Sequence, residues 1–270
     1  MPAHFLDIHS RRLFCTRSNP LAGAACLRVL VLPPFAEELN KCRRVLAMTV
    51  RALSAQGCDV LWPDLFGSGD SAGEFADARW QDWRADVVAL AAWHAAQLPD
   101  LRFAILAVRS GCLLLGDASD GGLLAHGARV VLWQPVLHGG RFLQQFLRVR
   151  VMAARLAGGN DRVEDLETAL RRGEAVECAG YTIGAELGLG LMAATLDAEQ
   201  LRGAKVRALE FKSEEGGSVT RPLAQLCTQL RNDGDEAEAR CVVAESFWAS
   251  QEISAPPSVV EATVRAMLAP

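Results

Sequence analysis

The sequence predicts an α/β fold, in which helices flank a central, mostly parallel sheet. Short apolar segments of strand length, rich in Val, Leu and Ile, alternate along the chain with longer segments of helical periodicity. The chain has 270 residues, of which 50% are hydrophobic and 22% are charged. A chain of this length and composition can bury a full-sized core, which excludes a disordered or collagen-like protein.

The strands are expected where the apolar segments are short. Residues 4–15 predict an antiparallel hairpin that turns at His9, Ser10 and Arg11, because apolar and polar residues alternate on each side of this turn. The further strand candidates are residues 28–32, 59–62, 103–107, 129–133, 206–211 and 240–244.

Long helices are expected between these strands. The candidates are residues 41–56 with Asn40 as N-cap and Gly57 at the C-terminal end, a helix from Asp77 or Asp82 to about Leu98, and a helix from Pro257. Trp80 and Trp83 fall on the apolar stripe of the second helix, which favours a place in the core.

The segment from Leu137 to Gly203 interrupts the alternation. It predicts helices without strands, at residues 142–156, 163–171 and 183–196. We expect a core formed by residues 1–136 and 204–270, with residues 137–203 as a helical insertion. This insertion is either a lid over a site or a plain structural subdomain.

Composition excludes several classes of function. The formal net charge of −4 gives no electrostatic reason to expect nucleic acid or an anionic membrane as partner. The eight cysteines form no C-x-x-C pair and no lysine follows a glycine, so we expect no metal site and no phosphate-binding loop. We also expect no cofactor. The start of the chain does not resemble a signal peptide, and no apolar run has the ~18 residues of a membrane span. We therefore expect a soluble, cytoplasmic protein with a small-molecule substrate, and leave a homodimer open.

Distinctive loops follow four of the expected strands. The carboxyl ends of parallel strands meet at one edge of a sheet, where ligand sites of open α/β sheets form. The loops are residues 33–41, whose backbone N–H groups could face an oxyanion, 63–71 with two glycines, the turn at 108–114, and Gln134-Pro135.

The order of these segments resembles the α/β-hydrolase superfamily. The resemblance rests on a P-D-L-x-G-x-G-x-S loop, a long helix, and a strand that turns sharply into a helix. More narrowly, PPFAEELNKCRR, PDLFGSGDS, LWQPVLHGGRFLQQFLR and SFWASQEISAPPSVVEAT resemble the exosortase A system-associated hydrolase 2 family. That resemblance implies a hydrolase-like protein encoded beside genes for exopolysaccharide synthesis and for sorting proteins with a PEP-type C-terminal signal.

Two registers fit the G-x-S-x-G elbow that carries the nucleophile in this superfamily. If Ser110 is the nucleophile, Val108 and Cys112 replace the glycines, and a β-branched residue stands where crowding is greatest. If Gly111 is the second glycine, small residues fall correctly and Arg109 takes the place of the nucleophile. We prefer the second register on steric grounds. Arginine stays protonated in proteins and cannot act as that nucleophile.

The remaining members of a Ser-acid-His triad are incomplete. In this superfamily the histidine comes last in the chain, but no histidine follows His138. By position, Glu214 falls near the acid site and Phe247 or Trp248 falls where the histidine belongs. His138 is the only candidate base that could reach Ser110, while Cys112 is expected in a packing position.

The expected site contains many charged residues. Arg109 would lie at the N-terminus of the elbow helix, where the helix dipole disfavours a cation and a compensating anion is needed. Glu37, Glu38 or Glu252 could supply that anion, or an acidic substrate could. Catalytic candidates are Ser110, Glu214, His138 and Glu252; binding candidates are Phe35, Glu37, Glu38, Lys41, Arg44, Asp64, Arg109, Gln134, Trp248 and Gln251.

Two functions remain open from the sequence. The first is a hydrolase of an ester or thioester with an acidic group. In it the nucleophile is either Ser110 or a water molecule that Glu37, Glu38 or Glu252 activates. The second is a non-hydrolytic protein that binds an anionic metabolite or a partner protein through Arg109.

Overall fold

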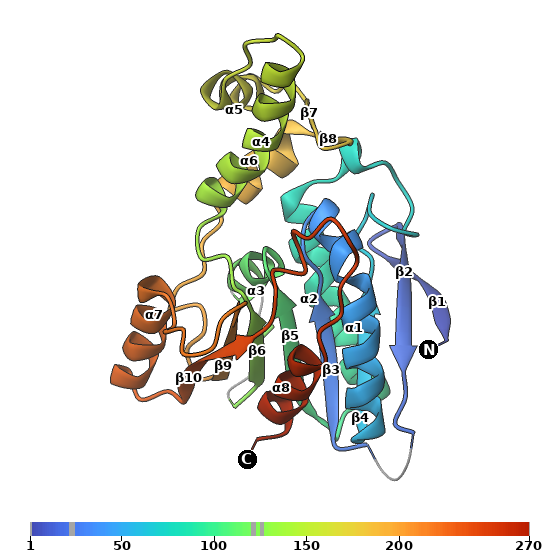
Figure 1. Ribbon diagram of the computed structural model, residues 1–270. Helices are drawn as coiled ribbons and strands as arrows, with labels where there is room; N and C mark the ends of the chain where they lie inside the picture. Colours follow the sequence, from blue (N-terminus) through green and yellow to red (C-terminus); the bar gives the residue numbers. More distant parts are fainter. Residues whose placement is uncertain (1, 22–24, 120–122, 125–126, 270) are drawn as a thin grey trace.

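A single eight-stranded sheet organises the chain in the computed structural model, which describes residues 2–21, 25–119, 123–124 and 127–269. The strand order is β1-β2-β4-β3-β5-β6-β9-β10 (Figure 1). β1 and β2 pair antiparallel, β2 pairs antiparallel with β4, and the neighbours in the remaining order β4-β3-β5-β6-β9-β10 are parallel. The strands are β1 (Ala3–Ile8), β2 (Arg11–Ser18), β3 (Leu27–Leu32), β4 (Cys58–Pro63), β5 (Arg102–Val108), β6 (Arg129–Trp133), β9 (Lys205–Lys212) and β10 (Ala237–Val243).

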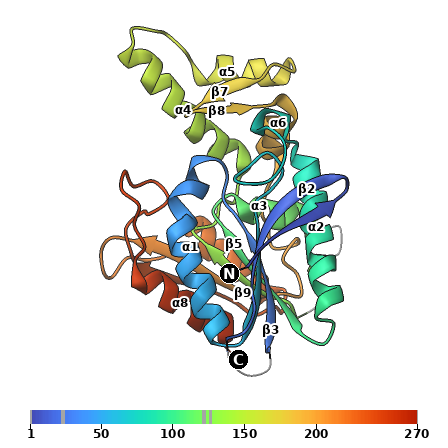
Figure 2. The same ribbon diagram turned by 90° about the vertical axis from the view of Figure 1, so that its right-hand side faces the viewer.

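Helices cover both faces of this sheet (Figure 2). α1 (Glu37–Ala55) and α8 (Pro257–Leu268) pack on one face, where Val45 and Met267 join the apolar side chains of β3, β5 and β6. α2 (Trp80–Gln97), α3 (Gly111–Ser119) and α7 (Arg221–Asn232) contribute to the core on the other face. Both faces of the central parallel strands β4, β5 and β6 are therefore buried, which explains why these strands are largely apolar.

The strands and their hairpin confirm the α/β class that the sequence predicts. The start of α1 is the clearest error in the expected helices: α1 begins at Glu37, four residues before the expected start. Asn40 is therefore inside the helix and is no N-cap; its side-chain amide donates to Glu37 and to the Tyr181 hydroxyl. Glu37 and Glu38 in the first turn complement the helix dipole, so the helix begins there without a side-chain cap.

A unit of helices and one small hairpin lies between β6 and β9 in the chain, beyond the carboxyl edge of the sheet (Figures 1 and 2). It consists of α4 (Gly139–Leu156), α5 (Val163–Arg171), β7 (Val176–Cys178), β8 (Tyr181–Ile183) and α6 (Ala185–Ala193). The expectation of helices without strands was wrong, because β7 and β8 form a hairpin. Its two-residue turn, Ala179-Gly180, has positive φ at both residues, as tight hairpins require.

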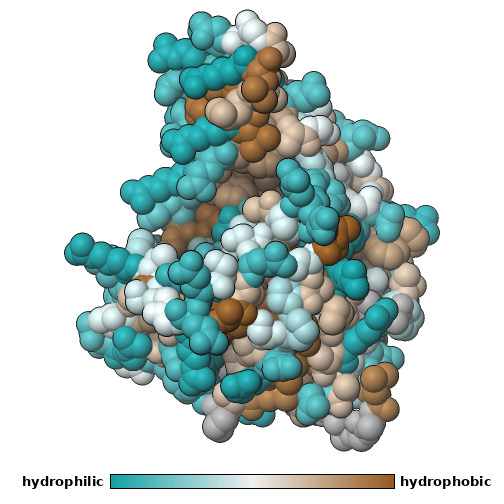
Figure 3. Space-filling model, in the orientation of Figure 1, coloured by the Kyte–Doolittle hydropathy of each residue, from teal (hydrophilic) through white to brown (hydrophobic). Residues whose placement is uncertain are grey.

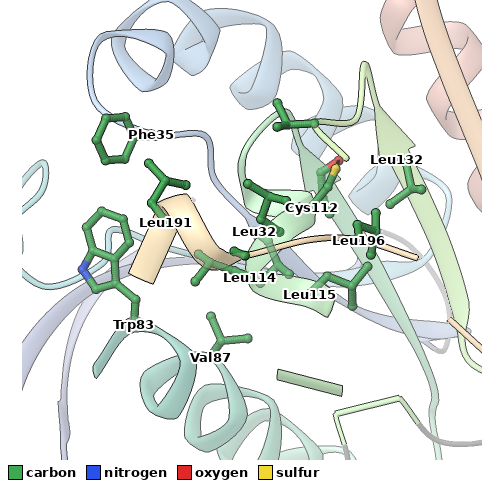
Figure 4. Close-up of a cluster of buried hydrophobic side chains, with 14 of the residues drawn as sticks. Leu32, Phe35, Trp83, Val87, Cys112, Leu114, Leu115, Leu132, Leu191 and Leu196 are labelled. Atoms are coloured by element: carbon green, nitrogen blue, oxygen red, sulfur yellow. Dashed lines mark hydrogen bonds between the residues drawn. The ribbon is translucent and has the colours of Figure 1, made fainter. Parts of the chain in front are cut away.

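The core continues from the sheet into this unit. Figure 4 shows Leu32 of β3, Trp83 and Val87 of α2, Cys112 of α3 and Leu191 of α6 in one buried apolar cluster. α4 and α6 approach closely, since a Cβ at Gly139 would lie 1.8 Å from the backbone oxygen of Leu191. In the part of the chain that the structure describes, no helix has the length and apolar character needed to span a membrane.

Candidate functional site

The turn between β5 and α3 forms a sharp elbow with Arg109 at its apex. Arg109 has φ 54°, a left-handed conformation that is uncommon for any residue with a side chain. Gly111 is required two positions later, because a Cβ there would lie 2.4 Å from the backbone oxygen of Leu32. This is the geometry of a nucleophile elbow in the second of the two registers, with arginine in the place of the nucleophile.

Arg109 is held by a carboxylate on the neighbouring helix. Its Nη2 donates to Glu38 Oε1 at 2.9 Å, and its Nε donates to both carboxylate oxygens at 3.2 Å. Its Nη1 donates to the backbone oxygen of Gln134 at 3.1 Å. Of the three candidate counter-anions, Glu38 is therefore the one that pairs with Arg109. Burial raises the pKa of the Glu38 carboxyl, and the Arg109 guanidinium opposes that rise.

Trp248 lies against Arg109, in the loop after the last strand. The Arg109 guanidinium carbon is 4.9 Å from the centroid of the Trp248 ring. In the superfamily that the sequence resembles, the catalytic histidine follows the last strand and contacts the nucleophile. In this chain an arginine at the elbow and a tryptophan after the last strand are in contact. Phe247, the other residue considered for this position, is buried beside Trp133 and Phe211.

Ser110 does not point into the site. Its side chain is only 2% exposed, and its Oγ accepts a hydrogen bond from the backbone N–H of Phe35 at 2.8 Å. Phe35 belongs to the loop after β3, whose N–H groups we expected to face an oxyanion. One such donor is thus already used within the protein. Cys112 is fully buried, and burial raises the pKa of its thiol, so it packs rather than reacts.

A cavity of about 300 Å³ opens beside Arg109. The side chains of Gln134, His138, Arg141 and Gln145 line it with Glu210, Thr220 and several apolar residues. His138 is exposed at the N-terminus of α4, and no hydrogen bond joins it to Ser110, although the structure describes both residues. The space-filling view shows a hollow between the helical unit and the body of the molecule (Figure 3).

Glu210 is a cavity residue that the sequence analysis missed. It lies within β9, is buried, and accepts hydrogen bonds from the backbone N–H and the hydroxyl of Thr220, both at 2.9 Å. The Lys212 Nζ lies 3.5 Å from Glu210 Oε1, so the two side chains form an ion pair. Glu214, the expected acid, is exposed in the loop that follows and does not line the cavity. A carboxylate inside an otherwise apolar strand end is the signal that could have identified Glu210.

Aromatic rings pack beside the elbow, and one of them, Phe142, also lines the cavity and lies 6.0 Å from the Arg109 guanidinium carbon. The Phe35 ring is buried and makes edge-on contacts with Phe75, Trp83, Phe142 and Phe146, with centroids 5.3–6.3 Å apart. Such contacts stabilise a packed cluster. The cavity beside Arg109 is bounded by this cluster at Phe142 and, across from it, by Glu210 of β9 and Leu223 of α7.

The remaining binding candidates lie outside the cavity lining. Asp64 is buried and binds Arg43 and the backbone N–H of Asp70, so it holds the loop after β4. Glu37 and Lys41 pair with each other on α1, and Lys41 also donates to the backbone oxygen of Gln251. Arg44 on α1 and Glu252 in the loop after β10 are exposed, as is the Gln251 side chain. Among the residues that the structure describes, no His, Cys, Asp and Glu side chains cluster as a metal site.

Solved structures with a similar overall fold are known. The chain is similar to Est1E from Butyrivibrio proteoclasticus with bound ferulic acid, with a TM-score of 0.66 and 12% identity over 98% of this chain and 96% of that one. The chain has the α/β-hydrolase fold. A thermostable carboxyl esterase from Bacillus coagulans gives a TM-score of 0.61 and 13% identity, covering 89% of each chain.

A third similar structure is alpha/beta hydrolase domain-containing protein 10 from mouse, with a TM-score of 0.58 and 12% identity over 98% of this chain and 96% of that one. No protein-family model and no curated protein sequence matches this chain. At these identities the α/β-hydrolase fold is shared, and function must be argued from the site itself.

Proposed function

We propose that this chain is a non-hydrolytic protein of α/β-hydrolase fold that binds a small acidic molecule in the cavity beside Arg109. The observation that carries the proposal is the apex of the elbow, where Arg109 is paired with Glu38 and covered by Trp248. Serine hydrolysis needs a hydroxyl at that position and an imidazole to take its proton. This apex has neither.

The acidic character of the ligand follows from the cations at the cavity. Glu38 already balances the charge of Arg109. Arg141, by contrast, lines the cavity, and no ion pair to it occurs among the described residues. A carboxylate or phosphate bound there would contact Arg141, with His138 beside it. Anion recognition is thus assigned to Arg141, with Arg109 as a positioning residue behind it.

The helical unit takes the role of a lid in this proposal. Arg141, Phe142 and Gln145, in the first turns of α4, line the cavity together with residues of the sheet edge and α7. Residues 137–203 would therefore cover the ligand, and residues 1–136 and 204–270 would form the core beneath it. The narrower family resemblance would place this binding protein beside exosortase A and exopolysaccharide genes.

The competing function is hydrolysis of an ester or thioester, which the shared fold favours. It would need Ser110 to leave its hydrogen bond with Phe35 and turn toward His138, or a carboxylate such as Glu252 to activate water. We favour binding because the side chain of Ser110 is buried and already bonded.

A fluorophosphonate probe separates the two functions. We expect no adduct on the native chain, and no turnover of a panel of aryl esters and acyl thioesters. A Ser110-linked adduct that disappears in Ser110→Ala would overturn the proposal. Thermal unfolding with added small dicarboxylates and phosphate esters tests binding: at least one should raise the midpoint. Arg141→Gln should abolish that rise, while Arg51→Gln, an exposed position on α1, should keep it.

A further inference from the structure

The outer face of α4 carries apolar side chains that nothing in the described chain covers. Val149 is 52% exposed, Met152 57% and Leu156 89%. Their spacing of three and four residues places them on one side of the helix. On the opposite side of α4, the side chains of Leu143, Leu147 and Val151 are buried in the core.

The same helix is rich in arginine and contains no acidic residue. Residues 139–156 include four arginines, Arg141, Arg148, Arg150 and Arg155, and neither Asp nor Glu. Arg150 is paired with Asp161 at 2.8 Å. In the described ranges no ion pair joins Arg148 or Arg155 to a carboxylate. Exposed cations therefore flank exposed apolar side chains along the C-terminal half of α4.

We propose that the outer face of α4, formed by Val149, Met152 and Leu156 with Arg148 and Arg155, docks on an anionic lipid surface. A helix that lies in a membrane interface inserts apolar side chains at the level of the acyl chains and places arginines at the phosphates. The charge of the helix is complementary to such a surface. The net charge of −4 for the whole chain does not oppose this, because screening limits electrostatic attraction to groups within about 8 Å of the surface.

The size and place of this face favour lipid over a protein partner. A stable protein complex buries about 800 Å² on each partner, which three side chains on one helix cannot supply. The unit that contains α4 and α5 stands out from the body of the molecule, and apolar atoms lie among hydrophilic ones at that end (Figures 1 and 3). A projecting, narrow face can reach a lipid surface without a matching contour.

The docking face continues into the cavity lining. Gln145 lies one turn before Val149 on the same side of α4, and Gln145 and Arg141 line the cavity. Docking would therefore bring the cavity toward the lipid surface. The inference stands on α4 alone and does not depend on what the cavity binds.

Vesicle sedimentation tests the inference directly. The native chain should sediment with vesicles of phosphatidylcholine and phosphatidylglycerol, and far less with phosphatidylcholine alone or at about 1 M salt, where the screening length falls to ~3 Å. Arg148→Gln with Arg155→Gln should lower the partition by about 25-fold, or fivefold for each arginine near an anionic surface. Met152→Glu with Leu156→Glu should abolish sedimentation.

Ile253→Glu is the matched control, because Ile253 is 57% exposed in a loop outside α4. This variant should sediment like the native chain. Failure of the native chain to bind anionic vesicles would overturn the inference, and so would binding that survives Met152→Glu with Leu156→Glu. Concentration-dependent dimerisation that these two substitutions abolish, without vesicle binding, would instead assign the face to a second copy of the chain. None of these outcomes depends on the hydrolase or ligand assays.

Discussion

Two arginines in this molecule are held in the same manner in very different places. Arg17 on β2 binds Asp59 through two nitrogens, at 2.9 and 3.1 Å, and lies 5.8 Å from the Trp93 ring centroid. Arg109 binds Glu38 through two nitrogens and lies 4.9 Å from the Trp248 ring centroid. In the first cluster His94 completes the contacts of Asp59, at 2.8 Å.

The difference lies in the backbone and the surroundings. Arg17 is in a regular strand, and its partner Asp59 is buried, where it also contacts His94 of α2. Arg109 has a positive φ, which is costly for a residue with a side chain, and a cavity opens beside it. An ion pair that served packing alone would not need such a strained position. The strained elbow beside a cavity is therefore the candidate site, whereas the Arg17 cluster belongs to the core.

Removing the carboxylates should give the largest effects. Asp59→Ala should lower the free energy of unfolding by about 4 kcal/mol and Glu38→Ala by about 3 kcal/mol, because each leaves a largely buried arginine, with 19% and 15% of its side chain exposed, without its partner. Urea denaturation measures both, with Glu186→Ala, in the exposed pair with Arg79, as a control expected within about 0.5 kcal/mol of the native chain. A loss below about 1 kcal/mol for Glu38→Ala would mean that Arg109 is available to a ligand.

The elbow itself should be sensitive to a single methyl group. Gly111→Ala should cost about 2–3 kcal/mol, because the new Cβ would meet the backbone oxygens of Leu32 and Pro33 at 2.4 and 2.6 Å, and these cannot move aside freely. Gly217→Ala is the control, since its Cβ would meet only the flexible Lys212 side chain. If the two variants unfold at the same urea concentration, the close packing of the elbow is not what sets its shape.

Much of this fold could be predicted from the sequence, and the reason is physical. β6 (Arg129–Trp133) and α5 (Val163–Arg171) have the expected bounds, because a fully buried strand and an amphipathic helix each have a clear hydrophobic pattern. The β7–β8 hairpin could not be found in that way. Its strands of three residues are too short to establish a period, and the only local signal is Ala179-Gly180 at the turn.

The site was predictable only where local sterics decide it. The need for a small residue at Gly111 favours the register with Arg109 at the apex, where the structure has a positive φ. The choice of Glu38 over Glu37 depends on where α1 begins, and the choice of Trp248 over Phe247 depends on how the loop after β10 turns. Glu210 depends on which end of β9 meets the cavity. The choices of Glu38 and Trp248 are tertiary facts that no local pattern contains, whereas Glu210 had a local signal in its place within a strand.

The two clusters should respond to pH in opposite directions. Hydrogen bonds from His94 and Arg17 outweigh the burial of Asp59 and hold its pKa below the ordinary value of 3.8. The ionised Asp59 carboxylate therefore stabilises the fold at pH values above 3.8, and this stabilisation is lost as the pH falls through the lowered pKa. The pKa of Glu38 is raised above 4.5 by burial, so its ionisation costs stability as the pH rises from about 4.5.

Unfolding free energies measured between acid and neutral pH test these signs. Relative to the native chain, Glu38→Gln should remove a fall in stability with rising pH, of at most about 1.4 kcal/mol per pH unit for one proton. Asp59→Asn should instead remove a fall on the acid side. Parallel pH profiles for the two variants would contradict the contrast between the clusters.

The tryptophans should give the smallest difference. Trp248→Phe should cost about 1 kcal/mol and Trp93→Phe about 0.5 kcal/mol, since the guanidinium lies closer to the Trp248 ring, at 4.9 Å against 5.8 Å. Trp248 also packs against Phe247, at 5.2 Å between centroids, so part of its effect is lost packing. Repeating Trp248→Phe in an Arg109→Met background isolates the cation–ring contact by a double-mutant cycle. A coupling near zero would mean that Trp248 only fills the space where the fold family keeps a histidine, whereas a coupling of about 0.5 kcal/mol would make it part of the device that holds Arg109 in place.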